Sequence, residues 1–315
     1  MTPGAANTRR GDWGAYLLLM TAPLCWAGNI VLARGVVDMI PPVSFAFWRW
    51  STAFILLLPF TWRRLRTDWP LVRQHWKILT LISLLGISCF NTLLYSAVHT
   101  TTAINGALIQ STMPAVIILI SLALYREPVT IRQLGGVAAC ILGACIVVLR
   151  GHLGALMAMA VVRGDVIMVV AVVIYAAYSA LLRQRPPIHP LSFMIVTFGI
   201  GVFGLLPLYV WEVTAVGAFP LTWQTVWSIL YVAAFPSIVA YFCWNSGIDR
   251  IGPNRGGLFI NFIPVFAAVM AVAWLGESLQ WFHFAGMGLV LGGMIVFNWY
   301  GAPHGKKDSG DIRAR

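Results

Sequence analysis

The residues able to do chemistry lie at helical spacing inside long apolar segments. Asn91 and Tyr95 are four residues apart, which places them on one face of a helix, and His99 follows at the same interval. Tyr241 and Asn245 repeat the two residue types in reversed order, about 150 residues further along the chain. Amide and phenol groups donate and accept hydrogen bonds, so this pattern predicts a surface that holds a small molecule.

Other apolar segments carry polar and aromatic residues of the same kind. A polar group in hydrocarbon costs free energy unless it finds a partner, so we expect these residues to line a central cavity. The predicted substrate-binding residues are Trp26, Asn29, Asn91, Tyr95, Gln110, Tyr175, Tyr178, Ser179, Tyr241, Asn245 and Asn261. Hydrogen bonding between neighbouring helices is the alternative role for such residues. His99 lies at the end of its segment, where it either faces a loop or relays protons.

One charge and two prolines also lie within apolar segments. Arg49 is the only formal charge well inside one, and three roles are open to it: reaching towards the interface, bonding a neighbouring carbonyl, or binding a substrate carboxylate. Pro114 and Pro264 occupy matched mid-segment positions, and neither has an N–H for the carbonyl four residues back. We expect a kink at each, which acts as a hinge or offers the freed carbonyls of Gln110 and Ile260 as acceptors.

The elements that must position these residues are membrane spans. The chain has 315 residues, of which 59% are hydrophobic and 10% charged, and its mean hydropathy is +0.82. About 20 apolar residues cross a bilayer as a helix, so the length suits ten spans and the composition excludes a soluble domain or a nucleic-acid-binding protein. The ten segments lie near 13–33, 43–62, 78–98, 103–125, 133–149, 166–182, 191–211, 223–248, 256–276 and 279–300.

The basic residues predict how these spans are oriented. The chain has 21 Lys and Arg residues against 10 Asp and Glu. If the N-terminus is cytoplasmic, only Arg34, Arg150 and Arg163 fall on the opposite face, Arg49 lies inside a span, and the other 17 are cytoplasmic. Because Lys and Arg concentrate in cytoplasmic loops, this separation supports ten spans with both termini in the cytoplasm.

The sequence contains an internal repeat. Pro42-Val43-Ser44-Phe45 returns as Pro190-Leu191-Ser192-Phe193, and further matches at an offset near 150 run collinearly through five segments. Five is odd, so the second copy enters the membrane from the opposite face. The predicted fold is an all-α integral membrane protein with ten transmembrane helices, arranged as two inverted five-helix repeats, residues 13–150 and 164–301, around a central cavity.

Short motifs resemble those of the EamA family of the drug/metabolite transporter superfamily. They are Trp26-Ala27-Gly28-Asn29 and the turns Glu127-Pro128 and Gly276-Glu277, where we expect the carboxylates to cap helices or form ion pairs. The resemblance covers about residues 13–301. It implies a bacterial cytoplasmic (inner) membrane protein with a cavity lined mainly by helices 1, 3, 4, 6, 8 and 9. Characterised members export amino acids and other metabolites, and an aromatic amino acid exporter is among them.

No catalytic, metal or cofactor site is predicted. The motifs G-x-S-x-G and H-E-x-x-H are missing, the six His residues are scattered, and we expect a transporter rather than an enzyme. None of the ten Asp and Glu residues is mid-span, which favours facilitated or weakly proton-coupled export by alternating access.

The predicted chamber is uncharged and rich in aromatic and amide groups. It suits a neutral or zwitterionic molecule with an apolar part, such as a neutral or aromatic amino acid. The alternatives are a multidrug or other metabolite exporter of the same superfamily and, in other classes, a channel or an intramembrane enzyme. Expected partners are the small-molecule substrate and membrane lipid, without nucleic acid, and the chain is expected as a monomer or a homodimer.

Overall fold

The computed structural model describes residues 9–126, 130–152, 162–251 and 256–299, and these residues form helices without strands. Glu127, expected above as a cap, lies outside the described residues. The helices are α1 (Arg9–Gly35), α2 (Pro42–Gln74), α3 (Trp76–Ser83), η1 (Leu84–Cys89), α4 (Phe90–Val98), α5 (Ala103–Gln110), α6 (Met113–Tyr125), α7 (Ile131–Val148), α9 (Arg163–Leu181), η2 (Leu182–Gln184), α10 (Pro190–Val216), α11 (Trp223–Ala234), η3 (Phe235–Val239), α12 (Ala240–Ile251), η4 (Gly257–Asn261), α14 (Phe262–Leu275) and α15 (Trp281–Trp299).

These helices form ten spans, which we number in chain order. Eight stretches of the described chain are long and apolar enough to cross a membrane, and the shorter apolar helices Phe259–Leu275 and Trp281–Val296 complete the set. Span 3 joins α3, η1 and α4, and span 8 joins α11, η3 and α12. Span 4 joins α5 and α6, and span 9 joins η4 and α14. The all-α membrane fold predicted from the sequence is confirmed.

Local sequence explains where several helices begin and end. The Thr102 hydroxyl caps α5 by accepting from the backbone N–H of Asn105 at 3.1 Å. Thr130 and Gln133 form a capping box at the start of α7. Gly276 ends α14 with φ +65°, a left-handed conformation that glycine adopts without strain.

The chain reverses after each span, so helix ends gather on two faces. We call the end of the bundle where α1 begins the first face and the end where α1 finishes the second face. At the second face, Glu212 of α10 accepts from the backbone N–H groups of Val43 and Ser44, at 3.0 and 2.6 Å, where α2 begins. At the first face, Asp68 of α2 accepts from the N–H of His189 at 3.0 Å, where α10 begins. A two-fold axis in the membrane plane produces this reciprocal pairing.

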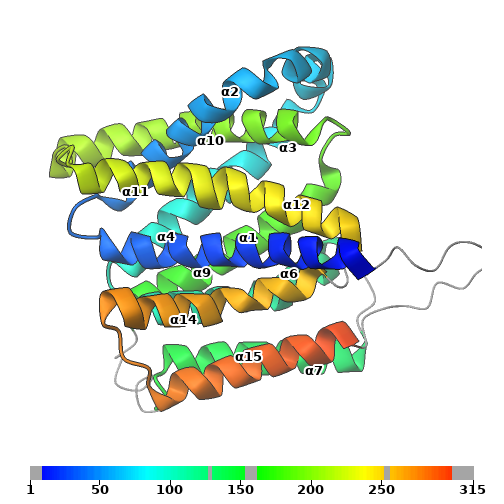
Figure 1. Cartoon of the computed structure of the whole chain (residues 1–315), viewed down its shortest axis with the longest axis vertical. Helices are drawn as coiled ribbons and strands as arrows, with labels where there is room; N and C mark the ends of the chain where they lie inside the picture. Colours follow the sequence, from blue (N-terminus) through cyan, green and yellow to red (C-terminus); the bar gives the residue numbers. More distant parts are fainter. Residues whose placement is uncertain (1–8, 127–129, 153–161, 252–255, 300–315) are drawn as a thin grey trace, which may run out of the picture.

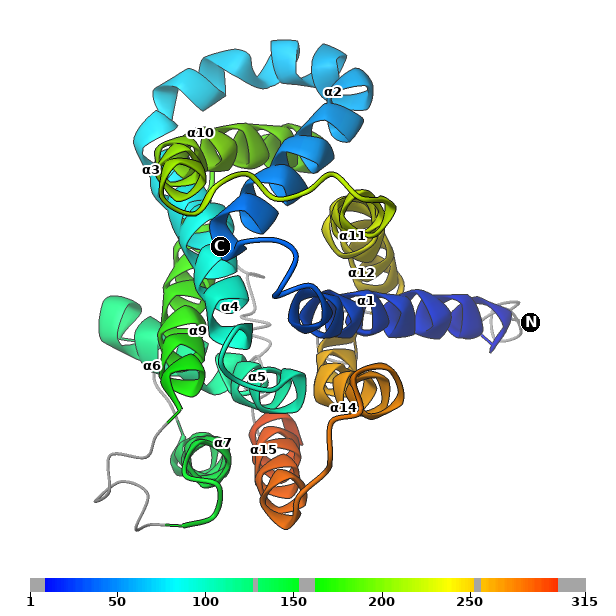
Figure 2. The ribbon, with the colours of Figure 1, turned by 90° about the vertical axis from the view of Figure 1, so that its left-hand side faces the viewer.

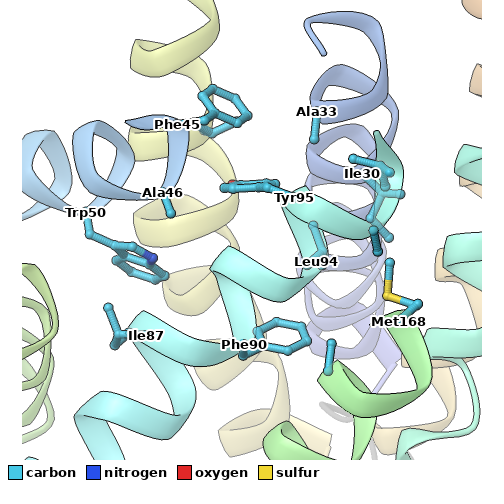
Figure 3. Packing of buried hydrophobic residues seen from close by; sticks show 14 of the residues in the cluster. Ile30, Ala33, Phe45, Ala46, Trp50, Ile87, Phe90, Leu94, Tyr95 and Met168 are labelled. Atoms are coloured by element: carbon cyan, nitrogen blue, oxygen red, sulfur yellow. The ribbon is translucent and has the colours of Figure 1, made fainter. Parts of the chain in front are cut away.

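Two helix pairs form opposite edges of the bundle. Figures 1 and 2 show α2 with α10 at one edge and α7 with α15 at the other. The second pair packs very closely, because a Cβ on Gly293 of α15 would lie 2.6 Å from the carbonyl oxygen of Gly136 of α7. Between the edges, α1, α4 and α9 contribute buried side chains such as Ile30, Leu94 and Met168 (Figure 3). This central layer supports the site described next.

Candidate functional site

A cavity of about 110 Å³ lies between the two repeats. Its walls come from spans 1 to 4 of the first repeat and from spans 6, 8 and 9 of the second. The lining residues are Trp26, Asn29, Arg49, Trp50, Gly86, Phe90, Asn91, Leu94, Gln110, Ser111, Met113, Pro114, Tyr175, Pro236, Tyr241, Ile260, Asn261 and Ile263. Since roughly 10–15 Å³ suffices for one water, the cavity has room for several waters or a small organic molecule.

Most of the residues predicted from the sequence meet at this cavity. Those that line it are Trp26, Asn29, Asn91, Gln110, Tyr175, Tyr241 and Asn261. Tyr95 lies directly behind the lining with 1% of its surface exposed. Tyr178 is also behind it, with its ring tilted against that of Tyr175 at a centroid distance of 5.1 Å and closely packed on Gly86.

Two predicted residues lie elsewhere, and their expected place in the lining is corrected. Ser179 belongs to a separate shallow pocket with Arg183 and Arg185, near the end of span 6. Asn245 is exposed on α12. Each lies one helical turn beyond a residue that does line the cavity, Tyr175 and Tyr241 respectively, and at that level the helix has passed the end of the cavity.

Arg49 is the electrostatic centre of the site. Its side chain is buried, with 5% exposed, and does not reach to the interface. Nε donates to the hydroxyl of Ser237 at 2.9 Å. Nη1 donates to Asn29 Oδ1 at 3.1 Å, Asn91 Oδ1 at 3.0 Å and the Tyr95 hydroxyl at 2.7 Å. All four acceptors are neutral, and within the described part of the chain no carboxylate pairs with Arg49. The expectation of an uncharged chamber is therefore wrong.

Two of the acceptors of Arg49 are held in place by two π-helical segments. They are η1 in span 3 and η3 in span 8, which lie at equivalent positions of the two repeats. Pro236 has no N–H for the carbonyl of Val232 four residues back, and the Ser237 hydroxyl donates to that carbonyl at 2.8 Å. In η1, the amide of Asn91 donates to the carbonyls of Gly86 and Ile87, both at 3.1 Å. Ser237 and Asn91, two of the four acceptors of Arg49, thus also satisfy a loosened helix.

Spans 4 and 9 are interrupted beside the cavity, at the two prolines predicted as hinges. Helix α5 ends at Gln110 and α6 begins at Met113, with Pro114 as its second residue. In the second repeat a 3₁₀ segment ends at Asn261, and α14 begins at Phe262, with Pro264 as its third residue. Pro114 lines the cavity. Pro264 is buried and directly follows Ile263, which also lines the cavity. Interrupted helices at the interface between repeats are characteristic of transporter binding sites.

Aromatic rings form much of the remaining wall. The indole N–H of Trp26 donates to the carbonyl of Pro236 at 3.1 Å, which fixes this ring against η3. Its centroid lies 6.4 Å from that of Tyr241 in an edge-to-face arrangement. Phe90 of the first repeat packs against Tyr175 of the second, with ring centroids 4.6 Å apart. Figure 3 shows Phe45 of α2 next to Tyr95 of α4, which closes the wall behind Arg49.

Several lining residues were not among the predicted ones. Trp50, Phe90, Met113 and Ile263 are apolar residues in apolar helices, and no sequence signal separates a cavity-facing apolar side chain from one in the core. Arg49 did carry a signal, because a charge inside a span is rare and usually functional. Among the described residues, no group of three His, Cys, Asp or Glu side chains could hold a metal ion.

Comparison with known proteins identifies the class. The chain matches the model of the EamA-like transporter family twice, over residues 13–149 and over residues 162–299. It therefore belongs to this family, and its two matches correspond to two repeat halves of a multi-pass membrane transporter. The family and the relatives below are transporters rather than enzymes.

Individual relatives share this architecture over nearly the whole chain. The chain is 26% identical over 285 residues to the uncharacterized transporter YyaM of Bacillus subtilis (strain 168), covering 89% of this chain and 92% of the relative. The uncharacterized transporter YetK of the same organism is 26% identical over 286 residues, with 90% and 86% covered. A solved structure described as "Crystal structure of protein" has a TM-score of 0.60 at 19% identity, covering 90% of this chain and 96% of its own, and supports the fold alone.

Proposed function

We propose that this transporter exports small metabolites, most of all neutral or aromatic amino acids, by alternating access. The proposal rests on buried polar atoms that have no hydrogen-bond partner among the described residues. Within the described part of the chain, Trp50 Nε1, Gln110 Oε1 and Asn261 Oδ1 are buried without a hydrogen bond, and all three residues line the cavity. Buried polar groups are rarely left unpaired in proteins, so a ligand that supplies the missing donors and acceptors fits here.

The residues around these atoms match the parts of an amino acid. The side-chain oxygens of Gln110 and Asn261 can accept from an ammonium group. Trp26, Phe90, Tyr175 and Tyr241 offer ring faces and edges for an apolar or aromatic side chain. A cationic drug is disfavoured, because Arg49 adds a positive charge to the same wall. These points favour an amino acid over the multidrug alternative.

Bonds between the repeats at the second face support alternating access. Glu277 of span 9 accepts from the backbone N–H groups of Ala103 and Ile104 in span 4, at 2.7 and 3.1 Å. His283 of span 10 bonds the amide oxygen of Asn105 in span 4 at 2.9 Å. Bonds of this kind must break when the repeats rock apart at this face, and they would re-form when it closes. Pro114 and Pro264 would serve as the hinges.

The chain is proposed to lie in the bacterial cytoplasmic membrane with both termini in the cytoplasm, as a monomer or a homodimer. Transport would be facilitated or weakly proton-coupled. In support, Glu212, Glu277 and Asp68 accept hydrogen bonds from helix N-termini near the two faces rather than lying free at the cavity. Carboxylates held in this way are poor candidates for a proton carrier at membrane depth.

Counterflow in proteoliposomes tests the proposal. Full-length protein is reconstituted and preloaded with unlabelled neutral amino acids, and uptake of labelled phenylalanine, leucine and alanine is compared with that of labelled cationic drugs. We expect saturable uptake that is stimulated by internal amino acid and persists without a pH gradient. Counterflow of the drugs alone would contradict the proposed substrate, arrest by collapse of the pH gradient would contradict weak coupling, and single-channel currents would indicate a pore.

A further inference from the structure

Arg49 is a buried cation that has no counter-charge among the residues the structure describes. Only 5% of its surface is exposed, and its four hydrogen-bond acceptors are two amides and two hydroxyls. Burying an ionised group is costly unless an opposite charge or a full set of hydrogen bonds compensates for it. Within the described residues the hydrogen bonds are present and the opposite charge is absent. A residue kept only for packing would not need this charge.

The guanidinium still has bonding capacity on the cavity side. Its hydrogen bonds to described residues use Nε and Nη1, and Nη2 has no partner among them. Three acceptors already share the two hydrogens of Nη1, so a further acceptor would bind the two hydrogens of Nη2. Arg49 lines the cavity, and its Cζ atom lies 4.6 Å from the ring centroid of Trp50, which holds the guanidinium plane in place.

We propose that the cavity binds the single carboxylate of its cargo, with Arg49 as the charge partner of that group. The unpartnered indole N–H of Trp50 in the same wall supplies a further donor. This inference rests on the proposed transport function and narrows its substrate class, because it makes the carboxylate necessary and leaves the amino group optional.

The lining favours a carboxylate over a phosphate group. Arg49 is the one Lys or Arg residue among the lining residues, and a phosphate monoester with two charges would keep one of them unpaired. A carboxylate carries one charge and matches the planar guanidinium. The rest of the wall is largely aromatic or aliphatic, as in Phe90 and Tyr175, so the body of the cargo is expected to be apolar.

Ligand pairs that differ only in the charged group test the inference on the unaltered protein. Binding to purified full-length protein in detergent is measured by calorimetry for 3-phenylpropionate, hexanoate and phenylalanine, each against its primary amide. We expect each carboxylate to bind about 10- to 100-fold more tightly than its amide, the range that a charge-assisted hydrogen bond supplies. Equal affinities within the pairs would overturn the inference, and so would the absence of saturable binding by all three carboxylates.

Variants assign the discrimination to Arg49. Arg49→Gln is expected to bring each carboxylate and its amide to within about threefold of each other, and Arg49→Lys to retain part of the preference. Arg73→Gln removes an exposed charge from the same helix and is the control, with the preference unchanged. Melting temperatures report whether each variant is folded. A folded Arg49→Gln protein that keeps the full preference would overturn the inference, and if that variant does not fold the ligand pairs still decide.

The results separate this inference from the proposed function. If 3-phenylpropionate and hexanoate bind through Arg49 but no amino acid undergoes counterflow, the amino acid proposal fails and the carboxylate site stands. If amino acid amides undergo counterflow as fast as the amino acids, transport stands and the carboxylate site fails.

Discussion

Asn91 and Tyr95 both accept from Arg49, but they differ in what else they hold. Asn91 also donates to the carbonyls of Gly86 and Ile87 in the π-helical segment of span 3. The Tyr95 hydroxyl donates to Asn29 Oδ1 at 2.9 Å, an atom that Arg49 already bonds. Removing the Asn91 side chain therefore takes one donor from each of two carbonyls and one acceptor from Arg49, whereas removing the Tyr95 hydroxyl leaves Arg49 Nη1 and Asn29 Oδ1 bonded to each other.

Asn91→Ala should destabilise the protein more than Tyr95→Phe. We expect the first change to cost roughly 1–3 kcal/mol and the second under about 1 kcal/mol, on the basis of the groups left unpaired. Thermal unfolding of the two variants in the same detergent measures the difference. Equal losses of melting temperature would contradict the assignment of Asn91 as the bond that supports η1.

The polar residues of the site could be predicted because membrane-embedded polar groups are few and visible. Their exact level along each helix could not, because it depends on where the cavity ends. Asn245 illustrates this. It is the repeat counterpart of Tyr95, but the counterpart of Arg49 is Thr197, which is buried and bonds the carbonyls of Phe193 and Met194 in its own helix. Among the described residues no Lys or Arg besides Arg49 is buried, so Asn245 lacks the kind of partner that Arg49 gives to Tyr95.

At the scale of helical elements, the two π-helical segments give the site its shape. A π-helical turn inserts one residue into the α-helical register, and such turns often occur at functional sites. They were not predicted, since the sequence around η1 carries no proline. The proline breaks of spans 4 and 9 were predicted, because the missing N–H of Pro114 and Pro264 is a direct chemical signal.

Pro236→Ala should return an N–H to the carbonyl of Val232 and favour a regular α-helix in span 8. We expect an unchanged or higher melting temperature but slower counterflow, because Ser237 would turn away from Arg49 Nε. Pro207→Ala is the matched control, since Pro207 is an exposed proline inside α10 away from the cavity. Unaltered counterflow in Pro236→Ala would show that η3 is dispensable for transport.

The contact between α7 and α15 gives a second prediction for the elements. Gly293→Ala would place a methyl group 2.6 Å from the Gly136 carbonyl oxygen and 2.9 Å from Cys140 Sγ, so the helices must separate. We expect a cost of about 1–3 kcal/mol, as for other overpacked interfaces. At the neighbouring Gly292 a Cβ would meet no atom within 4 Å, and Gly292→Ala should leave the melting temperature unchanged. Equal effects would mean that this contact is not a stability determinant.

At the scale of the whole molecule, the relation of the repeats was predictable and the details of their contact were not. Matches such as Pro42-Val43-Ser44-Phe45 with Pro190-Leu191-Ser192-Phe193 disclosed the duplication. The carboxylates that join the halves, Glu212 and Asp68, carried no motif, and only the folded chain brings them to the opposite helix starts.

Glu277→Gln should shift the balance between conformations that are closed and open at the second face. Charge at a helix N-terminus contributes about 0.3–1 kcal/mol, up to about 2 when partly buried, so we expect a roughly two- to tenfold gain in the open population. A cysteine placed at Ser111 in the cavity, in a background free of the native cysteines, reports this as faster labelling from the second face by a membrane-impermeant reagent. An unchanged labelling rate would exclude Glu277 as a latch.

An inverted duplication makes its two halves interchangeable, yet here only one half carries Arg49, and the other has Thr197 at the same place. If the proposed carboxylate site is correct, the substrate carboxylate stays bound to the first repeat throughout the transport cycle. The second repeat then moves relative to the apolar part of the substrate. The inward-facing and outward-facing states then hold the substrate differently, although the two repeats that form them are nearly equivalent. Because of this asymmetry, a substrate without a carboxylate has no preferred orientation in the cavity.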